Sequence, residues 1–100
     1  MKSFESKTVS IQDFVKKVET ALAGRDLGEI TRFKLQGAEL CVVFSKLGTT
    51  ELKYKIEATD SGFRALLVSE KVALTHRPLK ADITARLARV MEREGAQCAL

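Results

Sequence analysis

Residues 39–45, Glu-Leu-Cys-Val-Val-Phe-Ser, place the strongest constraint on how this chain can fold. The run is short, it is apolar on both alternating faces, and Gly37 and Gly48 bracket it. A short apolar run with β-branched and aromatic residues between turn residues is typical of a strand with neighbours on both sides. We therefore expect residues 39–45 to form the central strand of a sheet that the rest of the chain covers.

The segment from Glu51 to Thr59 alternates more strictly between apolar and polar residues. Leu52, Tyr54, Ile56 and Ala58 share one face, and charged or hydroxyl residues share the other. One apolar and one polar face is typical of an antiparallel sheet with one side in water. Residues 30–36 alternate in the same way, so these three segments are predicted to be consecutive strands joined by glycine-containing turns.

Residues 63–74 fit either of two structures. Phe63 and Leu67 begin a helical stripe, but the polar pair Glu70 and Lys71 interrupts it. The Asp-Ser-Gly turn before this segment, and its length close to that of the preceding strand, favour a strand over a helix. We predict a fourth strand, and a bulge in it is compatible with the pattern.

Amphipathic helices are predicted on both sides of these strands. Ser10 suits the N-cap of the first helix, and Gly24 and Gly95 suit the ends of the first and second helix. Residues 25–29 are predicted to form a turn. The apolar stripes at helical spacing are Ile11, Phe14, Val15, Val18 and Leu22 in the first helix and Leu79, Ile83, Leu87, Val90 and Met91 in the second.

The predicted fold class is therefore α+β, with an N-terminal helix, a four-stranded antiparallel meander and a C-terminal helix. Both helices are predicted to pack on one sheet face. A chain of 100 residues corresponds to one domain, residues 1–100. Residues 1–9 and 96–100 are predicted to be loose tails, although the first can alternatively form a short edge strand.

Composition excludes several classes of protein. With 45% hydrophobic and 30% charged residues, the chain is neither disordered nor fibrous. No run approaches the roughly 20 apolar residues of a membrane helix, so no membrane is expected as a partner. The first residues lack the apolar core of a secretory signal, and two cysteines do not make a disulfide framework. We expect a cytoplasmic location.

The sequence contains no recognisable catalytic constellation. It has one histidine, His76, and its two cysteines, Cys41 and Cys98, are far apart in sequence. Metal binding needs several converging ligands, and nucleophilic catalysis needs a nucleophile, a base and an orienting group. We therefore expect no cofactor or metal and no enzymatic activity, and we expect His76 to be structural or exposed.

Association with another protein, most simply with a second copy of this chain, is the first functional prediction. The central strand is apolar on its reverse face, which both helices are predicted to leave uncovered. The last helix has a strip of small residues that can admit a partner helix, although alanines are also good helix formers on a surface. A twofold dimer is the commonest small oligomer. The interface candidates are Cys41, Val43, Ala81, Ala85 and Ala88.

Nucleic-acid binding is the alternative, suggested by a net charge of +4. Both signs of charge are interspersed along the chain, whereas a polyanion-binding protein usually concentrates its positive charge. Asp82 lies among the arginines of the last helix, and the basic sheet face lacks aromatic residues for stacking on bases. The candidate residues are Arg86, Arg89 and Arg93 on the last helix and Arg32, Lys34, Lys53 and Lys55 on the outer sheet face.

Overall fold

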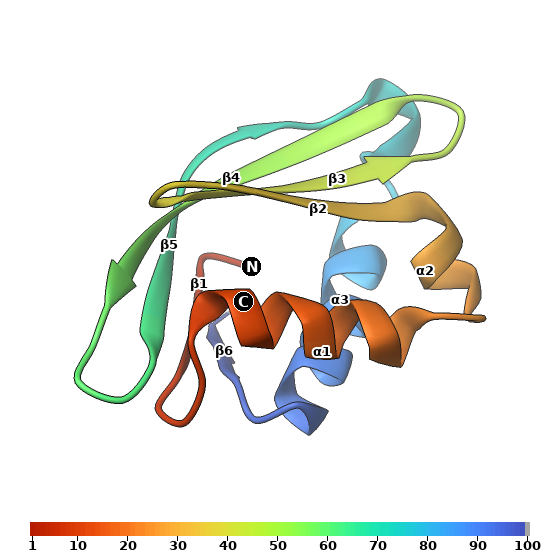
Figure 1. Cartoon of the computed structure of the whole chain (residues 1–100). Helices are drawn as coiled ribbons and strands as arrows, with labels where there is room; N and C mark the ends of the chain where they lie inside the picture. Colours follow the sequence, from red (N-terminus) through yellow and green to blue (C-terminus); the bar gives the residue numbers. More distant parts are fainter. Residues whose placement is uncertain (100) are drawn as a thin grey trace.

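A computed structural model describes residues 1–99 as an α+β fold built on one antiparallel sheet. Figure 1 shows the sheet curving over α1 and α3, which lie on the same side of it. The elements in chain order are β1 (Ser3–Ser6), α1 (Ile11–Leu22), α2 (Asp26–Ile30), β2 (Thr31–Gln36), β3 (Glu39–Ser45), β4 (Thr49–Ala58), β5 (Phe63–Lys71), the 3₁₀ turn η1 (Leu74–His76), α3 (Lys80–Arg93) and β6 (Gln97–Ala99).

The sheet has six strands in the order β2-β3-β4-β5-β1-β6, and all pairs are antiparallel. The predicted α+β class and the antiparallel strands β2 to β5 are confirmed, but the strand count of four is wrong. Residues 63–71 form a strand, as the turn before them indicated. This strand is bulged: Lys53 pairs with Ser69 and Tyr54 with Leu67, so Val68 is the extra residue.

Strands β1 (Ser3–Ser6) and β6 (Gln97–Ala99) lie within the segments 1–9 and 96–100 that were predicted to be loose tails, and residue 100 lies outside the described residues. β1 lies inside the sheet between β5 and β6, and Phe4 is buried. The backbone N–H of Lys2 donates to the carbonyl oxygen of Ala99 at 2.7 Å, which joins the two ends of the described chain. Both segments are too short for a local pattern to show, because their stability comes from pairing with strands far away in sequence.

The core lies between the sheet and the helices. Phe4, Phe14, Tyr54 and Phe63 form an aromatic cluster with ring centroids 5.1 to 6.1 Å apart. The Tyr54 hydroxyl is buried and donates to the carbonyl oxygen of Met1 at 2.8 Å. Burial of each such side chain contributes roughly 1.5–3 kcal/mol, so this cluster holds β1 and α1 against β4 and β5.

The helices begin and end for local reasons. Ser10 caps α1 as predicted, since its hydroxyl accepts from the backbone N–H of Asp13 at 3.3 Å. Gly24, at φ +78°, then allows the chain to leave α1. Residues 26–30 form the short helix α2 where the pattern predicted a turn. Among the helices of residues 1–99, none is long and apolar enough to cross a membrane.

Candidate functional site

A groove between α2 and α3 gathers the arginines of the helical side of the molecule. Arg86, Arg89 and Arg93 follow each other at helical spacing along one side of α3, and Arg25 faces them from the residue before α2. We call this surface the arginine groove. Its volume is about 240 Å³, and its lining consists of Leu22, Arg25, Asp26, Leu27, Arg86, Arg89, Val90 and Arg93.

Local structure explains how Arg25 reaches this groove. After α1 ends, the backbone N–H of Arg25 donates to the carbonyl oxygen of Leu22 at 3.0 Å, which turns the chain back towards α3. Leu22 and Val90 are buried, and Leu27 is half-buried and packs on the core. These apolar residues form the floor of the groove, and the arginines form its rim.

The charge of the groove is unbalanced. Of the eight lining residues, four are arginines and one, Asp26, is acidic. Arg86 forms an ion pair with Asp82 at 3.0 Å, but both side chains are largely exposed, so the pair is weak. Within residues 1–99, Arg25, Arg89 and Arg93 form no ion pair. The rim therefore offers guanidinium groups with free donors to an anionic ligand.

The structure separates the other predicted cations from this groove. Lys34, Lys53 and Lys55 lie on the outer sheet face, where Lys34 and Lys53 flank Cys41 in register and Lys55 is opposite Glu39. The Arg32 guanidinium instead donates to the carbonyl oxygens of Gly28, Glu29 and Thr31 and so covers the C-terminal end of α2. Of the seven candidates, only Arg86, Arg89 and Arg93 line the arginine groove.

Sequence reasoning missed Arg25. It lies in a connection without periodicity, and its nearness to α3 is a long-range contact. The only local signal was Gly24, which marked the end of α1 but not the direction of the chain after it.

The interface candidates do not form one surface. Ala88 is 1% exposed and packs in the core, Ala85 is half-buried, and only Ala81 is exposed. On the outer sheet face Val43 keeps 8% of its surface exposed, and Cys41 is half-buried. Burial raises the pKa of the Cys41 thiol, which lowers the fraction present as the reactive thiolate.

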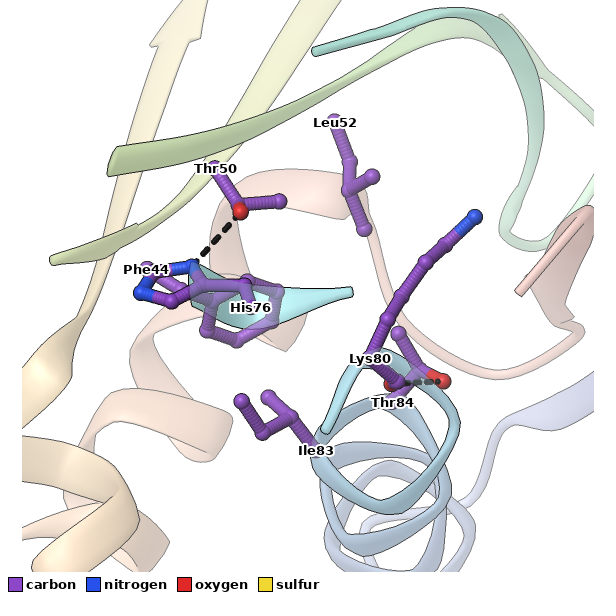
Figure 2. Close-up of a pocket in the computed structure, with 7 residues that line it drawn as sticks. All are labelled: Phe44, Thr50, Leu52, His76, Lys80, Ile83 and Thr84. Carbon is purple, nitrogen blue, oxygen red and sulfur yellow. Dashed lines mark hydrogen bonds between the residues drawn. The ribbon is translucent and has the colours of Figure 1, made fainter. Parts of the chain in front are cut away.

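A small cavity beneath His76 is too small for a ligand (Figure 2). Its volume is about 10 Å³, roughly the space of one water molecule. Both ring nitrogens of His76 are hydrogen-bonded, to Thr50 Oγ1 and to the carbonyl oxygen of Lys46, and the residue is buried. His76 therefore has a structural role, as expected. The cavity is lined by Phe44, Thr50, Leu52, His76, Lys80, Ile83 and Thr84.

No family model, curated protein or solved structure matches the chain significantly. Among residues 1–99, no three His, Cys, Asp or Glu side chains converge to hold a metal ion. The arginine groove, with four arginines and one acid in its lining, is the best candidate for a functional surface.

Proposed function

We propose that this protein is a non-enzymatic protein-interaction module that binds an acidic, partly apolar segment of another protein in the arginine groove. The observation that carries the proposal is the composition of the groove: a rim of four arginines against one acid, over a floor of Leu22, Leu27 and Val90. Carboxylates match the fork of a guanidinium, and an apolar residue between them can rest on the floor.

The apolar floor is the reason for preferring a protein segment to nucleic acid. A phosphate backbone has no apolar part to place against Leu27, which is half-buried in the free groove. The aromatic side chains that stack on bases are also missing from the groove lining. In addition, Lys34, Lys53 and Lys55 lie on the outer sheet face, where a ligand in the groove does not contact them.

Two arginines are suited to test the site because they are exposed and take no part in the core. Replacing Arg89 and Arg93 by Gln removes two positive charges from the rim and leaves Leu22, Leu27 and Val90 in place. The matched control is Lys53→Gln with Lys55→Gln, which removes the same charge from the outer sheet face. If binding depended only on the net charge of the protein, both double variants would weaken it equally.

The binding experiment uses a fluorescent synthetic peptide of alternating Glu and Leu, and a counterpart with Gln in place of Glu, measured by fluorescence anisotropy. We expect the acidic peptide to bind and the Gln peptide to bind much more weakly. The Arg89→Gln, Arg93→Gln variant is expected to bind the acidic peptide about tenfold or more weakly, because each lost charged hydrogen bond is worth about 1.5 kcal/mol or more. The lysine control is expected to bind as the unaltered protein does.

Parallel titrations with mixed-sequence DNA and RNA address the alternative function. If nucleic acid binds with strong salt dependence and the acidic peptide does not, the site is a phosphate-binding site and the peptide proposal is wrong. If the groove variant and the lysine control bind the acidic peptide equally weakly, the peptide does not bind in the arginine groove. Absence of any binding to the acidic peptide contradicts the proposed ligand.

A further inference from the structure

A second surface, distinct from the arginine groove, exposes large apolar side chains where two loops meet. Leu47 is 86% exposed, Leu74 is 74% exposed and Leu79 is 52% exposed. Leu47 lies in the β3–β4 loop, and the other two lie in the connection from β5 to α3. We call these three residues the leucine tip. Isolated exposed leucines are common, but here three of them lie on two adjoining loops.

Hydrogen bonds hold the two loops together. The Thr75 hydroxyl donates to the carbonyl oxygen of Leu47 at 2.8 Å, and the His76 ring is bonded to the carbonyl oxygen of Lys46. The Leu79 N–H donates to the carbonyl oxygen of His76 at 2.9 Å. Figure 1 shows the β3–β4 loop and the segment before α3 at the same end of the molecule. The leucine tip is therefore presented by an ordered platform.

The backbone of Leu47 is unfavourable for the stability of the free protein. Its φ of +54° lies in the left-handed region, and among residues 1–99 it is the only non-glycine residue with a positive φ. A side chain with a Cβ is disfavoured there relative to glycine. Since Leu47 is also exposed, its side chain gains no packing within the folded chain, and glycine would suit this position better.

The charges around the leucine tip are mainly positive. Lys46 and Arg77 are exposed and form no ion pair within residues 1–99. The acids on either side of this connection are engaged: Glu70 pairs with Lys80 at 2.8 Å and Asp82 pairs with Arg86. Exposed leucines with cations beside them fit an anionic lipid surface, which offers phosphates outside and acyl chains beneath.

From these features we propose that the leucine tip docks the protein on an anionic lipid surface, a peripheral contact that departs from the absence of a membrane partner expected from the sequence. The three leucine side chains enter the boundary between headgroups and acyl chains, and Lys46 and Arg77 contact lipid phosphates. A second copy of this chain is a poorer occupant, because a twofold contact brings each patch against itself and places cations opposite cations. The proposal does not depend on the arginine groove or its ligand.

The test is flotation of the protein with vesicles of phosphatidylcholine alone and of an equimolar mixture of phosphatidylcholine and phosphatidylglycerol. We expect binding to the mixed vesicles and little binding to phosphatidylcholine alone. Leu47→Gly is the decisive variant. Because glycine suits the left-handed backbone, we expect thermal unfolding at the same or a higher temperature, together with about tenfold weaker binding to the mixed vesicles.

Three further variants show which residues are responsible for vesicle binding. Lys46→Gln with Arg77→Gln is expected to reduce binding to the level seen with phosphatidylcholine alone. Leu66→Ser, which removes a partly exposed leucine of the outer sheet face, and the groove variant Arg89→Gln, Arg93→Gln are expected to bind the mixed vesicles as the unaltered protein does.

Several results overturn this proposal. One is absence of binding to the mixed vesicles, and another is unchanged binding of Leu47→Gly. A third is loss of vesicle binding in the groove variant instead, because lipid phosphates then occupy the arginine groove. A fourth is a dimer of the unaltered protein that Leu47→Gly dissociates, which shows that a second copy covers the leucine tip.

Discussion

Thr50 Oγ1 and His76 Nδ1 lie 2.6 Å apart, and their hydrogen bond ties β4 to the segment that leads into α3. The carbonyl oxygen of Lys46 can only accept, so His76 Nε2 carries a proton, and in the neutral ring Nδ1 accepts from the Thr50 hydroxyl. Thr50 Oγ1 in turn accepts from the backbone N–H of Ala73 at 3.1 Å. The buried Thr50 hydroxyl therefore links the start of β4 to two positions in the connection between β5 and α3.

Thr50→Val is expected to destabilise the protein by about 1–3 kcal/mol, although valine has nearly the same shape. The substitution leaves His76 Nδ1 and the Ala73 N–H without partners in a buried place. Urea unfolding followed by circular dichroism measures the change. Thr49→Val is the control, because Thr49 is exposed and its change is expected to stay within about 0.5 kcal/mol. Equal stability of both variants contradicts the role of Thr50.

Phe4→Ala is expected to destabilise the protein by about 3–5 kcal/mol, which is the usual cost of removing a buried phenylalanine. Phe4 is 1% exposed and lies 5.1 Å from the Tyr54 ring, centroid to centroid. Chemical denaturation gives the free energy of unfolding, and Lys7→Ala is the exposed control. A loss below about 1 kcal/mol for Phe4→Ala indicates that β1 does not belong to the folded sheet.

Both thiols are expected to react slowly in the folded protein. Burial raises the pKa of Cys98 from 9.0 to about 11, and burial also raises the pKa of Cys41. At about pH 8, two pKa units lower the thiolate fraction of Cys98 about a hundredfold, and the thiolate is the reactive form. Reaction with Ellman's reagent measures the rate. In urea both cysteines should react as ordinary thiols, and equally fast reaction without urea contradicts their burial.

The same burial predicts a loss of stability at alkaline pH. The pKa of Cys98 is raised to about 11, and that of Tyr54 is also raised by burial, so the unfolded chain loses these protons first. Their contribution is present below the unfolded thiol value of 9.0 and decreases as the pH rises towards 11. Urea unfolding between these pH values measures the decrease. In Cys98→Ala the free energy of unfolding should decrease less as the pH rises from about 9 towards 11. The same decrease as in the unaltered protein contradicts the contribution of Cys98.

The homodimer expected from the sequence stays a prediction. Light scattering after size exclusion, repeated over a range of protein concentrations, measures the mass in solution, and a dimer of the 11.1 kDa chain is the expected result. Cys41→Lys places a charge at a half-buried position of the outer sheet face and is expected to weaken a dimer formed through that face. A monomer at all concentrations contradicts the prediction.

Local patterns were sufficient for the elements that bury a regular face. Leu52, Tyr54 and Ile56 alternate along β4, and all three are buried. β1 and β6 lacked such a pattern because each has only a few residues, and their strand structure depends on the chain segments beside them. For the same reason the sequence predicted a structural or exposed His76 but did not indicate Thr50 as its partner.

The candidate site likewise has features that the sequence predicted and features that it did not. The sequence by itself determined the amphipathic faces, the helix ends at Gly24 and Gly95 and the arginine row of α3, because these depend on residues within one or two turns of each other. Only the tertiary structure decided that Arg25 completes the groove, that Arg32 covers α2 and that the two loops of the leucine tip are hydrogen-bonded to each other. These relationships join residues far apart in sequence, and chain packing alone sets the distances between them.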